Sequence, residues 1–302
     1  MINNCGEMLS YEGFSSVILS QMRQRLSDRV NPEDIRIEKK LLNNDTMADS
    51  LDFHVKGSSC MPSVRLGELY DAYVSGERLE DIVDDLGEIY NRSAVISSEV
   101  MSGINAALAD GDAACRLLEF RLINRERNRG RLDGCLYREL GEFALSYYLK
   151  TGISDQGWYS LSVTDDMCEA WGMTEDELYD IAMDNMNLSQ CFRFQRGGTM
   201  DPIGEENPMF ILTSDMGING ATVIVSRKVR EKVAEYLNDD YYILPSSVHE
   251  LIIIPKKKAS AVHHLVETVR SVNRSDAVPE GDFLSDNVYE YCRSTGEIRL
   301  AC

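Results

Sequence analysis

The most apolar part of the chain, residues 241–255, reads YYILPSSVHELIIIP and constrains the fold more than any other segment. Its two apolar runs, YYIL and VHELIII, are short and rich in aromatic and β-branched residues, which is typical of buried strands. Between the runs, Pro245 and two serines favour a bend. The segment therefore predicts two strands inside a hydrophobic core, with the polar pair His249 and Glu250 in an otherwise apolar run.

Helical and strand-like patterns alternate along the rest of the chain. Apolar residues three and four positions apart predict helices over about residues 13–29 and 79–90, and Ser93 is suited to cap a further helix. A short apolar segment at residues 50–57 predicts a strand. The TEDE sequence at residues 174–177 predicts a capping box, in which threonine and glutamate satisfy each other's free amides at a helix start.

The segment ADGDAA, residues 109–114, is the best candidate for a domain boundary because it is small, acidic and contains glycine. The predicted fold class is α+β. The expected organisation is a small N-terminal α+β unit at residues 1–92, a connecting helix and linker at residues 93–114, and a larger C-terminal α+β domain at residues 115–302 with an antiparallel or mixed sheet flanked by helices.

The net charge of −19 argues against a general nucleic-acid-binding protein, because Lys and Arg supply most of the affinity for phosphates. Hydrophobic residues make up 43% and charged residues 27% of the chain, which is typical of soluble globular proteins. The longest apolar runs are far shorter than a membrane span, and the N-terminal MINNCGEMLSYEGF lacks the pattern of a secretory signal. We expect a cytoplasmic protein that does not bind membranes, of unknown oligomeric state.

The eight cysteines form no CxxC pair, so we expect reduced thiols and no metal site. No GxGxxG and no P-loop is present, and we expect no cofactor. His249-Glu250 is similar to the start of the zinc signature HExxH, but Ile253 stands where the second histidine is needed. Side chains of adjacent strand residues also point to opposite faces, so His249 and Glu250 are unsuited to one ion.

Ser247 and His249 are suited to a hydrolase that pairs a nucleophile with a base, with Glu250 as a further candidate catalytic residue. Such a site needs another polar group at His249, for which Asp215, Asn219 and Arg125 are candidates. The structural alternative is that His249 or Glu250 forms a hydrogen bond to a neighbouring strand or loop, since buried polar groups are usually paired.

Two glycines in MGINGA, residues 216–221, could cradle an anion with their backbone amides. The apolar runs on both sides favour a different interpretation, a β-hairpin with Asn219-Gly220 in its turn.

The arginine segment, from Arg116 to Arg138, carries seven arginines and three acids in a chain that is acidic elsewhere. Arginine is suited to carboxylates and phosphates. Acid-rich helices at residues 80–88 and 174–184 could neutralise it within the fold, or it could bind an acidic ligand or partner.

The segments LLEFRLINRERNRGRL, CEAWGMTEDELYDIAMDN, FILTSDMGINGATVIV and YYILPSSVHELIIIP, in this order, resemble a bacterial family described as domain of unknown function 5688. The resemblance covers about residues 65–300, and GINGA and ILPSSVHE are its most specific parts. The chain is also faintly similar to the uncharacterised YtpQ-like proteins. The resemblance implies a stand-alone cytosolic protein and supplies no activity, cofactor or catalytic residues.

Our leading hypothesis is a non-enzymatic protein that binds a protein partner or a small acidic ligand, through the 216–221 turn, the 245–250 bend and the arginine segment. The alternatives are the hydrolase described above and an acidic decoy that occupies a basic nucleic-acid-binding partner. The residues expected to bind the ligand are Gly217, Asn219, Gly220, Ser246, His249, Arg125 and Arg127.

Overall fold

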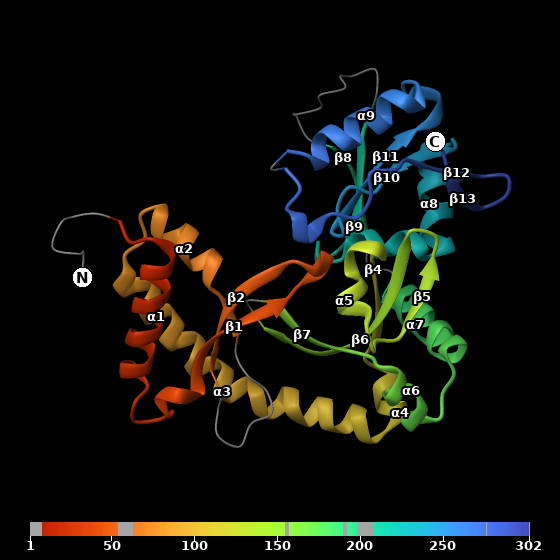
Figure 1. The fold of residues 1–302 in the computed structure, drawn as a ribbon. Coiled ribbons are helices and arrows are strands. Elements are labelled where there is room, and N and C mark those ends of the chain that lie inside the picture. The colour runs from red at the N-terminus through yellow and green to blue at the C-terminus, as the bar shows by residue number, and fades with distance from the viewer. Residues whose placement is uncertain are drawn as a thin grey trace. The chain divides into compact units, whose positions relative to one another are not determined.

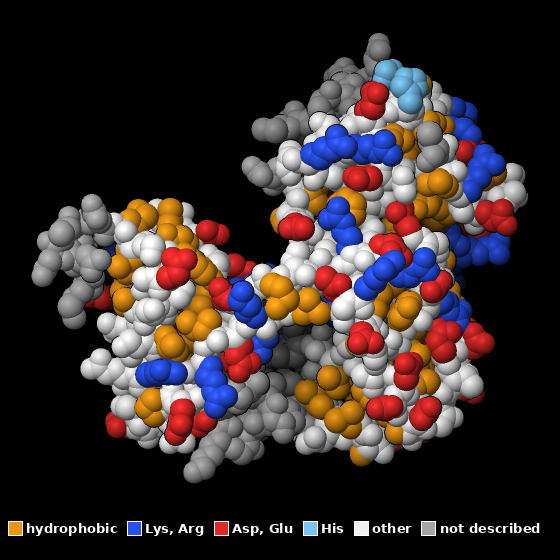
Figure 2. Space-filling model, in the orientation of Figure 1, with side chains coloured by type: hydrophobic (Ala, Val, Ile, Leu, Met, Phe, Trp, Pro, Cys, Tyr) orange, Lys and Arg blue, Asp and Glu red, His pale blue; other side chains and the backbone are white. Residues whose placement is uncertain are grey.

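The computed structural model describes residues 8–53, 63–154, 157–189, 192–197, 208–275 and 277–301 (Figure 1). Helices are interspersed with three antiparallel sheets in these ranges, which confirms the predicted α+β class. Side chains of both charge signs are mixed on the face shown in Figure 2. None of the helices in the described ranges has the length and apolar character that crossing a membrane requires.

The chain divides into two compact units. Unit 1 comprises residues 1–42, 46–109 and 151–159, and unit 2 comprises residues 43–45, 110–150 and 160–302.

Unit 1 combines a three-stranded antiparallel sheet with helices. Its strands are β1 (Ile35–Leu41), β2 (Met47–Phe53) and β3 (Ser63–Arg65), and its helices are α1 (Tyr11–Arg25), η1 (Pro32–Asp34), α2 (Leu66–Val74) and α3 (Leu79–Ala109). Strand β2 lies between the other two and corresponds to the strand predicted at 50–57, of which residues 54–57 lie outside the described residues.

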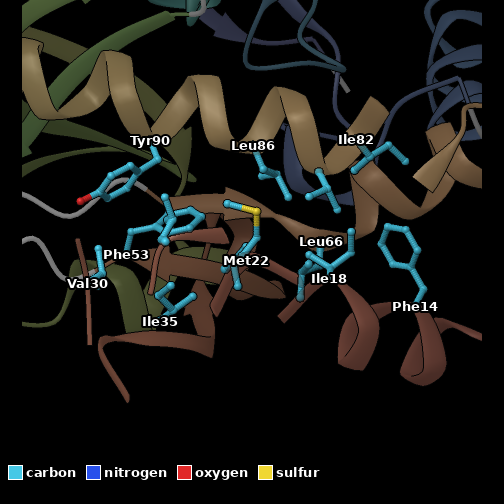
Figure 3. Close-up of a cluster of buried hydrophobic side chains, with 13 residues drawn as sticks. Phe14, Ile18, Met22, Val30, Ile35, Phe53, Leu66, Ile82, Leu86 and Tyr90 are labelled. Atoms are coloured by element: carbon cyan, nitrogen blue, oxygen red, sulfur yellow. The ribbon is translucent and has the colours of Figure 1, made fainter. Parts of the chain in front are cut away.

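The core of unit 1 is formed by side chains of its helices and sheet. Phe14, Ile18 and Met22 recur every fourth residue along α1 and are fully buried, as the apolar spacing predicts. Figure 3 shows that side chains from α1 and α3 point toward one another, with side chains of the strands between them. The labelled residues are Phe14, Ile18, Met22, Val30, Ile35, Phe53, Leu66, Ile82, Leu86 and Tyr90.

Helix α3 is continuous, although the sequence predicts one helix ending near Tyr90 and a second one capped by Ser93. Ser93 lies inside α3, because the apolar spacing on its two sides joins into one helical pattern. Residues 93–109 group with unit 1, whereas we expected them in a connecting segment. The division between the units falls at Ala109, where the ADGDAA segment begins.

A four-stranded sheet, most of whose residues belong to unit 2, is organised around its longest strand, which pairs with the other three. The strands are β4 (Leu118–Asn124), β5 (Tyr137–Leu140), β6 (Phe143–Ser154) and β7 (Gly157–Ser162). Helix α7 (Glu175–Ser189) packs on this sheet, where the Tyr179 ring lies 5.5 Å from the Phe120 ring, centroid to centroid. The predicted capping box begins α7: the Thr174 N–H donates to Glu177 Oε2 at 2.8 Å, and the Glu177 N–H donates to Thr174 Oγ1 at 3.3 Å.

The second sheet of unit 2 has six antiparallel strands in the order β13-β12-β10-β11-β9-β8. They are β8 (Phe192–Arg196), β9 (Phe210–Ser214), β10 (Tyr241–Leu244), β11 (Glu250–Pro255), β12 (Tyr289–Cys292) and β13 (Glu297–Leu300). The two strands predicted in the most apolar segment are β10 and β11, which are neighbours in the middle of the sheet. The remaining helices of unit 2 are η2 (Asn43–Asp45), α4 (Gly111–Cys115), η3 (Glu126–Asn128), α5 (Arg129–Leu132), α6 (Asp165–Trp171), η4 (Gly220–Val225), α8 (Arg227–Leu237), η5 (Lys256–Lys258), α9 (Val262–Asn273) and η6 (Glu280–Asp282).

Strand β10 is covered on both faces, which explains why all four of its residues are buried. Tyr242 and Leu244 pack with Leu265 and neighbouring residues of α9. Tyr241 points to the opposite face, because strand side chains alternate, and its hydroxyl donates to the Arg230 carbonyl of α8.

The predicted hairpin at Asn219-Gly220 is wrong. The apolar residues after the turn form the 3₁₀ helix η4, and β9 pairs instead with β8 and β11. Most of η4 is buried. A short apolar run predicts burial, but its pattern does not distinguish a strand from a buried helical turn.

Glu290 of β12 is buried, and its carboxylate accepts hydrogen bonds from Lys256 Nζ and, at 3.1 Å, from Arg299 Nη2. The bond from Lys256, with a smaller contribution from Arg299, lowers the pKa of Glu290 below its ordinary value. A carboxyl group of this kind stabilises the fold above its unfolded-state pKa, and the contribution is lost as the pH falls through the folded-state pKa.

We predict that Glu290→Gln lowers the free energy of unfolding at neutral pH by about 1–3 kcal/mol, since a hydrogen-bonded charge is lost. Urea unfolding across the acid range should show a smaller loss of stability for the variant than for the parent. Glu297→Gln, at an exposed position of β13, is the control and should behave like the parent. Identical acid sensitivity of Glu290→Gln and the parent would contradict the prediction.

Candidate ligand-binding site

Residues 280–285 of unit 2 join two of the segments that the sequence singles out. The Val248 N–H donates to the Asp282 carbonyl at 2.8 Å, and the Leu284 N–H donates to the Ser246 carbonyl at 3.0 Å. The Arg127 guanidinium lies 3.9 Å from the centre of the Phe283 ring. The 245–250 bend and one part of the arginine segment are therefore held by the same stretch of backbone.

His249 connects this bend to the 216–221 turn. Its Nδ1 accepts a hydrogen bond from the Asn219 N–H at 3.2 Å, so Nδ1 carries no proton. Its Nε2 lies 3.2 Å from Asp282 Oδ1 and donates to it. Both ring nitrogens are thus engaged with protein groups in unit 2.

This geometry gives the hydrolase hypothesis no activated nucleophile. The Ser247 hydroxyl oxygen accepts a hydrogen bond from the backbone N–H of His249 at 3.0 Å, and the imidazole is bound to other partners. Glu250 is exposed at the start of β11 and lies opposite Thr213 of β9 in the register. Asp215, the other acid considered for this site, is exposed.

The 216–221 turn is fixed by close contacts that only glycine permits. Gly217 has a φ of 68°, a left-handed conformation that favours glycine. At Gly220 a Cβ atom would overlap the Thr213 hydroxyl and the His249 carbonyl, and would lie 2.5 Å from the Ser214 nitrogen. The left-handed backbone therefore explains Gly217, and packing within unit 2 explains Gly220.

A network of buried asparagines holds the arginine segment against residues 280–284. Asn128 is fully buried; its Oδ1 accepts from the Asn44 N–H at 2.8 Å and its Nδ2 donates to Asn44 Oδ1 at 2.9 Å. Asn44 Nδ2 donates to the Glu280 and Phe283 carbonyls, at 2.7 and 2.8 Å. Asn124 Nδ2 donates to the Leu284 carbonyl at 2.9 Å. This network positions the neighbouring arginines on a rigid support.

Part of the arginine segment is neutralised by acids, as one of the two hypotheses expected. Arg138 forms a bidentate pair with Glu175 and a further bond to Asp176 at 2.5 Å, which confirms the pairing predicted with the helix at 174–184. The hydrogen bonds to Glu175, above all, raise the pKa of Arg138. The acids at residues 80–88 contact arginines of unit 1 instead; Asp84, for example, lies 2.5 Å from Arg25.

Arg125 and Arg129 are also paired, with Glu139 and Glu126 respectively. The other four arginines of the segment have no such pair. Among the described residues, no carboxylate lies within ion-pair distance of Arg116, Arg121, Arg127 or Arg131. Burial, and after it the nearby charge of Arg131, lowers the pKa of Arg121 to about 10. Burial also lowers the pKa of Arg131.

A pocket of about 560 Å³ lies beside the arginine segment in unit 2. Asp133 and Asp165 line it without a cationic side chain within ion-pair distance among the described residues. Cys135 lines it as well, and pairs with Thr164 through an isolated β-bridge that brings the start of α6 to the pocket. The lining residues are Arg125, Glu126, Arg129, Leu132, Asp133, Gly134, Cys135, Tyr137, Glu139 and Asp165.

The predicted site residues therefore fall into two neighbourhoods of unit 2. Hydrogen bonds and close contacts bring Asn219, Gly220 and His249 together, with Ser246 and Arg127 attached through residues 283–284. Arg125 instead lines the pocket. Within the described residues, no group of three or more His, Cys, Asp or Glu side chains is placed to hold a metal ion.

Sequence reasoning missed Arg121, Arg131 and Cys135. The signal that could have found the two arginines is the excess of cations in the arginine segment, which leaves some of them without a local acid. Nothing in the local sequence distinguishes Cys135 from a buried thiol.

The comparison with known families gives one match: the model of a family of unknown function (DUF5688) matches residues 11–293. This confirms the resemblance found in the sequence and extends it toward the N-terminus. No curated protein and no solved structure matches the chain.

We predict that Gly220→Ala destabilises unit 2 by about 3 kcal/mol, because the added methyl group overpacks a site closed by backbone atoms. Thermal unfolding followed by circular dichroism should show a midpoint several degrees lower. Gly67→Ala on α2, where nothing lies within 4 Å of a Cβ, is the control and should be neutral or slightly stabilising. A Gly220→Ala midpoint equal to that of the parent would refute the packing argument.

We predict that His249→Ala lowers the free energy of unfolding by about 1–3 kcal/mol, since Asn219 and Asp282 lose their partner. His249→Asn should recover part of the loss, because its amide oxygen can accept the Asn219 N–H. Melting temperatures of both variants, with exposed His263→Ala as control, test this. If His249→Ala melts like the parent, the ring does not serve stability and is retained for another reason.

Proposed function

Since this chain belongs to the family of unknown function DUF5688, its relatives supply no activity, and we propose from geometry that it binds a small polar molecule. The observation that carries the proposal is the pocket beside the arginine segment. Its volume of about 560 Å³ lies within the usual range for small-molecule sites.

The lining of the pocket suits a polar ligand. Charged side chains of both signs, the Tyr137 ring and the Cys135 thiol face the same space. The ion pairs of Arg125 and Arg129 with glutamates fix part of the wall, whereas Asp133 and Asp165 remain for a ligand. Fixed polar groups of this kind give orientation and specificity to a bound small molecule.

The asparagine network supports the proposal because it makes the wall of the pocket rigid. Asn128 is fully buried and directly precedes Arg129, which lines the pocket. A wall that is ordered before binding lowers the entropy cost of holding a ligand.

The acidic-decoy hypothesis requires acids gathered in a stripe on one face. On the face shown in Figure 2, acidic and basic side chains are interspersed instead. We carry small-ligand binding forward because the pocket gives it a defined location in unit 2.

We predict that filling the pocket abolishes ligand binding. Asp133→Trp places a large ring at an exposed position of the lining, and Asp166→Trp makes the same change one residue from Asp165, outside the lining. A thermal-shift screen of amino acids, dicarboxylates, sugar phosphates, nucleotides and polyamines first identifies a ligand. At 100-fold excess over its Kd, a ligand stabilises the parent by about 2.7 kcal/mol.

We expect the ligand to raise the melting temperatures of the parent and of Asp166→Trp, and to leave the melting temperature of Asp133→Trp unchanged. Equal shifts for the two variants would place the ligand elsewhere and contradict the proposal.

A further inference from the structure

We propose that the pocket beside the arginine segment binds an organic cation, a small molecule with primary ammonium groups on an aliphatic chain. The inference rests on the proposed function, to which it adds the chemical class of the ligand. It is carried by the charges that line the pocket and by the ion pairs that neutralise some of them.

The pocket carries an excess of negative charge. Its lining includes four carboxylates and two guanidinium groups, which gives a formal net charge of −2. A cleft lined by an excess of one charge sign attracts ligands of the opposite sign. The carboxylates are those of Glu126, Asp133, Glu139 and Asp165, and the guanidinium groups are those of Arg125 and Arg129.

Both arginines of the pocket are paired with glutamates. Arg125 pairs with Glu139 and also lies 3.9 Å from Glu126, and Arg129 pairs with Glu126. The arginine segment by itself would favour an acidic ligand. In the pocket, however, an anion would have to compete with a glutamate for each guanidinium group.

The two aspartates of the lining are the charges that remain for a ligand. Among the described residues, neither Asp133 nor Asp165 lies within ion-pair distance of a cationic side chain. Both are exposed, so their carboxylates are accessible to a molecule from solution. An ammonium group that binds there forms charge-assisted hydrogen bonds, which are stronger than those between neutral groups.

Backbone contacts fix the two aspartates at the same pocket, although they come from different elements. Asp133 follows α5 and Asp165 begins α6. An isolated β-bridge joins Cys135 to Thr164, and the Leu136 N–H donates to the Val163 carbonyl at 2.8 Å. Two carboxylates that are positioned before binding lower the entropy cost of holding a cation.

The arrangement favours an organic cation over a metal ion. Within the described residues, no group of three or more His, Cys, Asp or Glu side chains is placed to hold a metal. Ca²⁺ and Mg²⁺ bind several oxygen ligands that converge on one point. An ammonium group binds through individual N–H donors, so carboxylates that do not converge are sufficient.

The lining also offers carbon surface for the aliphatic part of such a ligand. Leu132 is buried and lines the pocket together with Tyr137. Methylene groups gain free energy when they leave water for such surface, and an aromatic ring attracts an ammonium group to its face. A diamine combines the two chemical features that the pocket accommodates.

The test is calorimetric titration of the full-length protein with putrescine, 1,4-butanediol and succinate. All three are four-carbon chains, which carry ammonium, hydroxyl and carboxylate groups respectively at both ends. We expect putrescine to bind the parent, and neither the diol nor the dicarboxylate to bind. The affinity for putrescine should fall as the salt concentration rises, because salt screens the exposed aspartates.

Asp133→Asn and Asp165→Asn should each weaken putrescine binding roughly 10-fold, the loss of one charge-assisted hydrogen bond. Both positions are exposed, so both variants should melt near the parent temperature without ligand. Asp133→Glu keeps the carboxylate and should retain most of the affinity. Asp166→Asn, on α6 but outside the lining, is the matched control and should bind like the parent.

Three outcomes would overturn the inference: no putrescine binding by the parent, tighter binding of succinate than of putrescine, or equal losses for Asp166→Asn and the two lining variants. If an anionic or neutral ligand binds the parent and is blocked by Asp133→Trp, the proposed function stands and only the inferred charge of the ligand is wrong. If putrescine binds Asp133→Trp and Asp133→Asn as it binds the parent, the cation lies outside the pocket, and both proposals fail.

Discussion

The hydrogen bonds from asparagine amides to the backbone of residues 280–284 are the interaction on which unit 2 depends. An asparagine side chain carries two donors and an acceptor, so Asn44 can bind two carbonyls and still pair with Asn128. Buried backbone groups must find partners, and a loop has no ladder to provide them. The amides provide those partners, and through them the bend with His249, the arginine segment and the pocket wall share one support.

The arginine segment shows how one stretch of sequence serves two purposes. Arg138 and Arg125 pair with carboxylates and tie strands to neighbouring elements, which is a structural use. Arg116, Arg121, Arg127 and Arg131 have no carboxylate within ion-pair distance among the described residues. Arg125 serves a second purpose as well, because it lines the pocket, where its ion pair with a glutamate fixes part of the wall.

Structural elements that depend on residues close together in the sequence could be predicted, whereas contacts between residues far apart in the sequence could not. The capping box at Thr174 and the strands β10 and β11 each depend on residues that are close together in the sequence. The local residue pattern therefore predicts both features. The prediction of a hairpin at Asn219 is wrong because an apolar run indicates burial but does not distinguish a strand from a helical turn. The partner of His249 is Asp282, and no periodicity relates two residues that far apart. Likewise, only the three-dimensional structure reveals that Arg121 has no carboxylate within ion-pair distance among the described residues.

The bonds of Asn44 have a consequence for how the chain folds. Asn44 and Phe283 are 239 positions apart, and residues 43–45 belong to the same unit as residues 280–285. During synthesis Asn44 leaves the ribosome long before its acceptors Glu280 and Phe283, so the network cannot close until the chain has been translated past residue 283. Closing so long a loop is entropically slow, and the hydrogen bonds of this network should therefore be among the last that unit 2 forms.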